Sequence, residues 1–255
     1  YAATAWYHKR AGAGRDLASW LAEAEAFATG DYTLALMKGN ALTDAERQAV
    51  AAKLHAFTGL STDYLLRTNL RIEYGALQKE LLADKGLTTG TLDTRFTGAT
   101  LDPLSKVASN DPQGSAIGAA YTAAFNDYVR GTLGYGAGTH YEGGLDVYGS
   151  WDYKHRPPGA DRALIALPNV LPDLAVAMKQ NPKMKLLVTG GYFDVSTPYF
   201  AGRYELRHLP VPKELQANIA YKYYASGHMV YVNPALLGEM HSDVAGFIRR
   251  TDGID

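Results

Sequence analysis

The sequence contains no cysteine among its 255 residues. Without thiols the chain can form no disulfide, no thiolate nucleophile and no thiolate metal site. It also contains no apolar run long enough to span a bilayer, and its formal net charge is only −1. A nearly neutral chain offers no broad electrostatic surface, so we expect neither nucleic acid nor a membrane as a partner.

The sequence also lacks an initiator methionine, and residues 1–7 do not have the charged-then-apolar layout of a signal peptide. We therefore expect the chain to be the interior of a longer protein, with any export signal in an upstream segment. Apolar residues make up 47% of the chain, which suffices for a buried core and excludes a disordered or fibrous protein.

The first third of the chain has the pattern of a helical region. Helical spacing from Leu17 predicts a helix that ends at Gly30. Thr43 and Glu46 form a capping box at the start of a second helix, which Gly59 ends. A third helix is predicted over residues 63–85, followed by a looped or extended segment to about residue 100.

The remainder changes to an alternation of helices and strands. Helices are predicted over 115–133 and 170–180, and two short apolar strands over 185–189 and 219–225. Residues 199–209 can supply a helix that joins two adjacent parallel strands, and the Asn233–Pro234 pair begins a final helix. This alternation indicates an α/β fold.

Two loops that follow the predicted strands carry the residues whose side chains are best suited to catalysis. Asp194 follows the first strand and His228 follows the second. In open α/β sheets reactive groups lie beyond the carboxyl ends of the strands, where a carboxylate can orient a histidine. Taken singly, an aspartate in such a loop is more often a turn former, and a Gly-His pair is more often a surface feature. Their shared placement, with the acid first, matches the order Ser, Asp, His of α/β-hydrolases.

The same two loops resemble a known family. Residues 188–198 (VTGGYFDVSTP) resemble the segment around the catalytic aspartate of serine carboxypeptidases, and residues 224–231 (YASGHMVY) resemble their histidine segment. Residues 1–8, 92–98 and 174–182 also resemble the bacterial branch of this family. The similarity extends over nearly the whole chain.

The resemblance implies a fold and an activity. The chain would be the C-terminal part of an α/β-hydrolase sheet, residues 116–255, with a mainly helical cap formed by residues 1–115. The activity would be that of an exopeptidase that releases C-terminal residues from a peptide substrate, with Asp194 and His228 as acid and base. Met229 would line the pocket for the last residue of the substrate, although plain apolar packing explains it equally well. We expect no cofactor, and a periplasmic or extracellular location.

The nucleophile of such an enzyme is missing from this sequence. A nucleophile elbow reads G-x-S-x-G, and none of the serines lies in that pattern. In the family the elbow lies upstream of the segment that residues 1–8 resemble. We therefore expect an upstream polypeptide segment to supply the serine, and this chain alone to be inactive.

Other groups of polar residues give weaker evidence for a functional site. His140, Glu142 and Asp146 could be drawn as a metal site, but they lack the H-E-x-x-H helix pattern, so we expect an exposed loop and no metal. Two alternative functions remain open: an acyltransferase or lyase on the same scaffold, and a non-catalytic binding protein that has kept the fold.

Overall fold

The computed structural model describes residues 1–136, 138–142, 144–147, 149–163 and 168–253. The chain divides into two compact units. The first comprises Tyr1–Ala116, Gly190–Phe200 and Tyr223–His241, and the second comprises Ile117–Thr189, Ala201–Lys222 and Ser242–Asp255. The loops that carry Asp194 and His228 therefore belong to the first unit, while the assignment of residues 1–115 to a cap and 116–255 to a hydrolase core stays a prediction.

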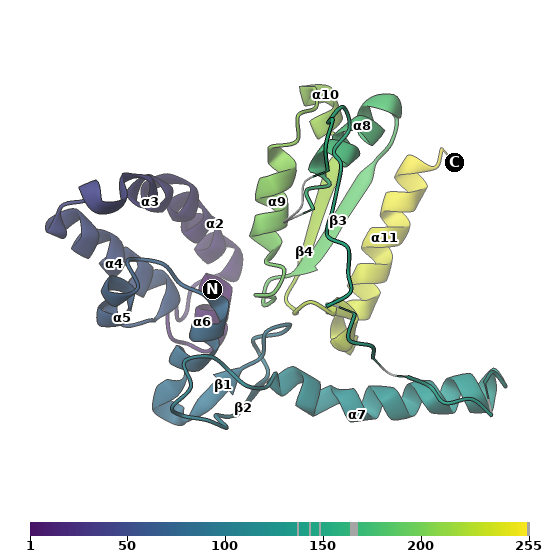
Figure 1. The fold of residues 1–255 in the computed structure, drawn as a ribbon, viewed down its shortest axis with the longest axis horizontal. Coiled ribbons are helices and arrows are strands. Elements are labelled where there is room, and N and C mark those ends of the chain that lie inside the picture. The colour runs from purple at the N-terminus through teal and green to yellow at the C-terminus, as the bar shows by residue number, and fades with distance from the viewer. Residues whose placement is uncertain (137, 143, 148, 164–167, 254–255) are drawn as a thin grey trace. The chain divides into compact units, whose positions relative to one another are not determined.

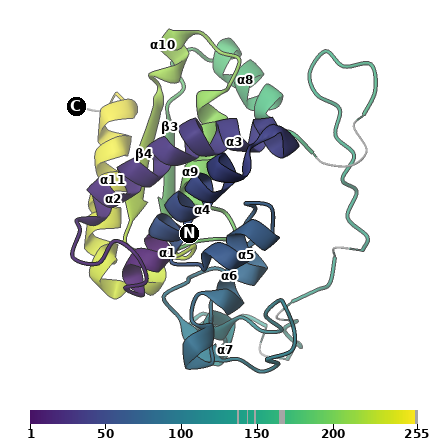
Figure 2. The same ribbon diagram turned by 90° about the vertical axis from the view of Figure 1, so that its left-hand side faces the viewer.

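The first third of the chain is mainly helical, as its sequence pattern predicts (Figures 1 and 2). Its helices are α1 (Ala2–Tyr7), α2 (Leu17–Phe27), α3 (Thr33–Lys38), α4 (Asp44–Thr58), α5 (Thr62–Arg67) and α6 (Tyr74–Glu80). Short π or 3₁₀ turns follow some of them, namely η1 (Ala28–Tyr32), η2 (Gly39–Ala41) and η3 (Ala83–Lys85).

The predicted helix ends are partly confirmed. The Thr43–Glu46 capping box opens α4 and Gly59 closes it in the left-handed conformation. Gly30 kinks the chain with non-helical dihedral angles, although helical turns continue beyond it into α3. The prediction of one helix over residues 63–85 was wrong, because the backbone takes positive φ at Asn69 and Leu70 and separates α5 from α6.

Leucines from α4, α5, α6 and their connections form the largest apolar cluster of the first unit. The cluster includes Leu54, Leu60, Leu65 and Leu77, with Val195 of the Asp194 loop packed among them. The helical region and the loop that carries the acid therefore share one core.

Shortening a side chain at the centre of this cluster should weaken the fold. Leu65 is 0% exposed, so Leu65→Ala should lower the free energy of unfolding by about 2–5 kcal/mol, through lost burial and a cavity. Urea denaturation followed by circular dichroism measures this change. Leu34→Ala on α3, where the leucine is 60% exposed, is the control. A loss as small as that of the control would contradict this assignment of the core.

The segment predicted as looped or extended contains two short strands, β1 (Leu87–Thr89) and β2 (Thr97–Ala99). They pair antiparallel, with Thr88 opposite Gly98. The connection between them contains residues 91–95, which contact both candidate loops.

The rest of the chain contains α7 (Pro112–Asn126), η4 (Asp127–Thr132), α8 (Leu171–Gln180), β3 (Leu186–Gly191), α9 (Tyr199–Arg207), α10 (Lys213–Gln216), β4 (Ile219–Tyr224), η5 (Val230–Val232), η6 (Pro234–Leu236) and α11 (Leu237–Thr251). In the second unit a cluster around Met178 of α8 includes Leu186 of β3, Leu206 of α9 and Ile219 of β4. Both helices therefore pack on the strands. No helix within the described residues is long and apolar enough to cross a membrane.

Strands β3 and β4 pair with each other and run parallel, as predicted (Figure 1). The amide of Leu186 donates to Asn218 O at 3.0 Å, and the amide of Tyr192 donates to Tyr224 O at 3.0 Å. The two bonds advance together along both strands, which requires a parallel pair. The fold is therefore mixed helix and strand, compatible with α/β. The four strands within the described residues, each of three to six residues, are too little sheet to define the hydrolase sheet.

Candidate active site

The structure brings Asp194 and His228 together, as their positions after two neighbouring strands predict. Asp194 lies three residues beyond the end of β3, and His228 lies four beyond the end of β4. The Nδ1 atom of His228 is 2.7 Å from Oδ2 of Asp194. The predicted hydrogen bond between the two side chains is therefore confirmed.

The Asp194 carboxylate is buried and fully supplied with donors. Its Oδ1 accepts hydrogen bonds from the backbone amides of Ser196 and Thr197, both at 2.9 Å. Its Oδ2 accepts the Thr197 hydroxyl at 2.6 Å and the His228 ring at 2.7 Å. One oxygen thus forms the turn that a loop aspartate commonly makes, while the other is directed to the histidine.

This arrangement selects one tautomer of His228. An ionised carboxylate only accepts hydrogen bonds, so Nδ1 of His228 carries the proton and Nε2 keeps its lone pair. The side chain is 45% exposed, and no residue in the described part of the chain bonds to Nε2. The open nitrogen can accept a proton from a nucleophile, as a triad base does.

Residues 91–95 hold the two loops at this distance through their backbone. The amide of His228 donates to Leu92 O at 2.7 Å. On the acid side, Val195 N donates to Thr91 O at 3.2 Å and Thr94 N donates to Phe193 O at 2.9 Å. The segment therefore bonds to His228 itself and to the residues on either side of Asp194.

The side chains of Asp93 and Arg95 add a second set of contacts to the histidine loop. Asp93 is 1% exposed and pairs with the Arg95 guanidinium at 2.7 Å. Asp93 Oδ2 also accepts the Gly227 amide at 3.1 Å. Arg95 donates to Ala225 O at 2.9 Å and to Ser226 Oγ at 3.0 Å. All three residues that precede His228 are thus bonded to this pair.

Thr4 of helix α1 and His8, which directly follows that helix, also contact the segment. Thr4 Oγ1 and Thr94 Oγ1 are 2.8 Å apart, and His8 Nε2 is 2.7 Å from Thr94 O. Burial lowers the pKa of His8 despite the opposing effect of this backbone bond. A neutral His8 with its Nε2 proton on Thr94 O is therefore a structural residue.

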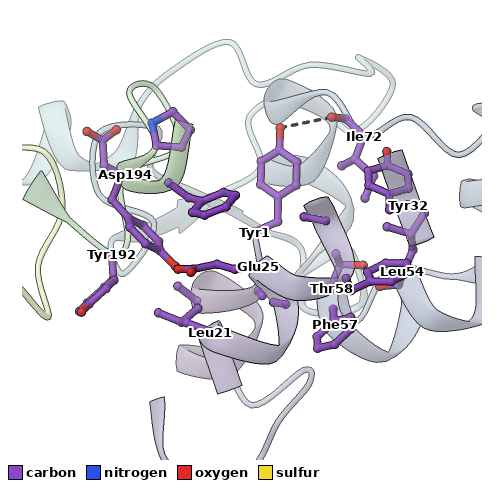
Figure 3. A pocket seen from close by; sticks show the side chains of 18 residues that line it. Tyr1, Leu21, Glu25, Tyr32, Leu54, Phe57, Thr58, Ile72, Tyr192 and Asp194 are labelled. Atoms are coloured by element: carbon purple, nitrogen blue, oxygen red, sulfur yellow. Dashed lines mark hydrogen bonds between the residues drawn. The ribbon is translucent and has the colours of Figure 1, made fainter. Parts of the chain in front are cut away.

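A cavity of about 330 Å³ lies on the side of Asp194 that faces the helical region (Figure 3). Aromatic side chains form much of its wall, including Tyr1, Tyr32, Phe57 and Tyr192. Burial, and then the charge of Glu73, raises the pKa of the Tyr1 hydroxyl to about 12, so this group stays protonated and donates to Ile72 O at 3.2 Å. Besides Asp194 the cavity is lined by Glu25, whose carboxylate accepts the Tyr199 hydroxyl at 2.7 Å, while most of its other lining residues are apolar or aromatic.

Met229 does not line this cavity. It is half-buried directly after His228, at the start of the short η5 turn. Its predicted contact with a substrate therefore remains a prediction.

The serine nearest to His228 in sequence is not placed as a nucleophile. Ser226 is fully buried, its hydroxyl accepts from Arg95, and it donates weakly to Val230 O at 3.4 Å. Together with the missing G-x-S-x-G pattern, this position leaves Nε2 of His228 without a serine partner among the described residues.

Of the three polar residues considered for a metal site, His140 and Glu142 form an exposed pair. His140 Nε2 and Glu142 Oε2 are 3.3 Å apart, and both side chains are largely in solvent. A group of three or more side chains able to hold a metal ion is not found in the described ranges.

Sequence reasoning missed three residues of this site. The contact of Thr197 with Asp194 could have been predicted from the Asp-x-x-Thr spacing, because this spacing allows the hydroxyl and amide of the fourth residue to reach the carboxylate. Asp93 and Arg95 fall within residues 92–98, which resemble the carboxypeptidase family, but nothing in their spacing indicates contact with residues more than 130 positions away.

Comparison of the chain with known protein families, with curated proteins and with solved structures gives no significant match. The geometry of the loops is therefore the basis on which a function is inferred.

Proposed function

We propose that this protein is part of a serine-type carboxypeptidase of the α/β-hydrolase superfamily, in which Asp194 and His228 are the acid and base of a Ser-His-Asp triad. The observation that carries the proposal is the 2.7 Å hydrogen bond from His228 Nδ1 to a buried carboxylate, with Nε2 left open to solvent. A surface histidine without catalytic function does not need a fully bonded buried carboxylate behind it.

In this proposal Nε2 of His228 transfers the proton, and Asp194 stabilises the charged ring that results. As the serine oxygen attacks the carbonyl carbon of the last peptide bond, its proton moves to Nε2 of His228. The resulting imidazolium is stabilised by Asp194 and then donates the same proton to the leaving amine. A water molecule then attacks the acyl-enzyme and gives a proton to Nε2 of His228, which passes that proton to the departing serine oxygen.

The serine would come from a segment other than residues 1–255. The open Nε2 supports this, as does the sheet: β3 and β4 form a parallel pair, and no other strand among the described residues joins that sheet. Parallel sheets are normally larger and covered on both faces. Additional strands beside this pair would complete the sheet of an α/β-hydrolase and bring the elbow to His228.

The cap, the cavity and Met229 would bind the peptide substrate. The helices before residue 115 would form a cap, the apolar wall beside Asp194 would contribute to a substrate cleft, and Met229 would contact the last residue of the peptide. A periplasmic or extracellular location suits an exopeptidase of this family.

The proposal is tested by comparing residues 1–255 alone with a preparation that also contains the segment with the nucleophilic serine. Residues 1–255 alone should release no C-terminal residue from a blocked dipeptide, and a fluorophosphonate probe for activated serines should not label them. A preparation that also contains a polypeptide with a G-x-S-x-G elbow should do both, with the label on that polypeptide. The mass and sequence of any co-purifying polypeptide identify the segment.

Labelling of residues 1–255 alone would show that the nucleophile is one of their own serines. Absence of labelling in every preparation, with the Asp194–His228 bond intact, would favour a non-catalytic protein.

A further inference from the structure

We infer that Asp93 and Arg95 are positioning residues that set the distance between His228 and Asp194. The inference deepens the proposed function and rests on it, but the contacts that carry it lie away from the proton-accepting nitrogen. Neither residue touches the imidazole ring, so any effect on His228 must pass through its loop.

Asp93 and Arg95 form one unit, in which the Asp93 side chain is 1% exposed and the Arg95 side chain is 17% exposed. The Arg95 Nε donates to Asp93 Oδ1 at 3.0 Å and its Nη2 donates to Asp93 Oδ2 at 2.7 Å. Such a two-point contact fixes the guanidinium plane as well as its position. The Arg95 amide also donates to Asp93 Oδ1 at 3.0 Å, so the unit is rigid relative to its own backbone.

This unit bonds to the histidine loop at three successive residues, through the backbone of two of them and the side chain of the third. Asp93 accepts the Gly227 amide, and Arg95 donates to the carbonyl of Ala225 and the hydroxyl of Ser226. An acceptor and two donors in a fixed arrangement leave the loop little freedom to rotate, so the direction in which His228 leaves it is set.

The same short segment is bonded to the acid loop. Thr94, between the two residues, donates both its amide and its hydroxyl to Phe193 O, at 2.9 and 3.1 Å. The Arg95 guanidinium also lies over the Phe193 ring, 5.4 Å from its centroid. One rigid segment thus holds the residue before Asp194 and the residues before His228.

We therefore expect that the hydrogen bond between His228 and Asp194 can be weakened without substituting either of these two residues. Asp93→Asn places an amide NH₂ against donors that need an acceptor. Arg95→Lys keeps the charge but not the fork that reaches Asp93, Ala225 and Ser226 together. Both variants should weaken or abolish the low-field proton resonance of His228 Nδ1–H in the isolated chain. Asp84→Asn, which alters the exposed Arg10–Asp84 pair, should leave it unchanged.

The assembled enzyme gives a second readout. Both variants should lower kcat by about 100-fold, because a displacement of the base by about 1 Å has that effect, with little change in KM. A merely stabilising residue would instead lower the temperature of unfolding and leave kcat of the folded fraction unaltered.

The outcomes separate this inference from the proposed function. A folded Arg95→Lys or Asp93→Asn chain that keeps the Nδ1–H resonance overturns the positioning function alone. If both variants unfold, the pair is a stability element and the inference is equally refuted. A wild-type chain without the resonance would instead contradict the Asp194–His228 bond, and with it the proposed function.

Discussion

Replacing His228 by alanine should lower kcat of the proposed carboxypeptidase, once assembled with its serine-bearing segment, by about 10⁴- to 10⁶-fold, the loss typical of removing a triad base. In the proposed mechanism the base would accept the proton of the serine during attack and pass it to the leaving amine, so both halves of the reaction would depend on it. KM for a blocked dipeptide should change little, because the ring acts in the transition state and contributes little to ground-state binding.

The variant should remain folded. The His228 side chain is 45% exposed, and the backbone bond from its amide to Leu92 O does not depend on the ring. His241→Ala, at an exposed histidine of α11, is the matched control and should retain wild-type activity. Steady-state kinetics with circular dichroism as the check on folding decide the matter. If His228→Ala keeps more than about one hundredth of the activity, a different group is the base.

The part of the site that could be predicted from sequence is the part with a local cause. A strand that ends in Gly190–Gly191 and a second that ends near Ser226 place whatever follows them at one edge of a parallel sheet. From this, the contact between Asp194 and His228 follows without knowledge of any other residue. The alternative interpretation of Asp194 as a turn former was also correct. Its Oδ1 accepts backbone amides of its own loop, while its Oδ2 accepts the His228 ring.

The part that could not be predicted depends on long-range packing. Asp93 and Arg95 lie in a short connection between β1 and β2, and only the folded chain brings this connection between the two loops. Similarly, the break between α5 and α6 has no glycine or proline to mark it. Asn69 and Leu70 take positive φ there, Tyr32 donates its hydroxyl to Leu70 O, and Leu70 is buried in the apolar cluster. Tertiary contacts of this kind override local helix propensity.

A single methyl group added at Gly227 should displace the loop that carries His228. A Cβ atom there would lie 2.4 Å from Asp93 Cβ and 2.5 Å from Leu92 O, far inside normal contact distances. Because Gly227 also donates its amide to Asp93 Oδ2, the clash falls on the bond that aligns the loop. Relief requires the chain to move away from residues 92–93, and His228 is the next residue along it.

We therefore expect Gly227→Ala to lower the free energy of unfolding by about 1–3 kcal/mol through overpacking, and kcat of the assembled enzyme by at least about 100-fold through displacement of the base. Urea denaturation and steady-state kinetics measure the two effects separately. Gly202→Ala in α9 is the matched control, because nothing lies within 4 Å of its added Cβ and alanine is the better helix former. That variant should be as stable as wild type or slightly more so. A Gly227→Ala chain with unaltered stability and kcat would mean that the histidine loop tolerates movement against Asp93, and that the position of His228 is set by Asp194 alone.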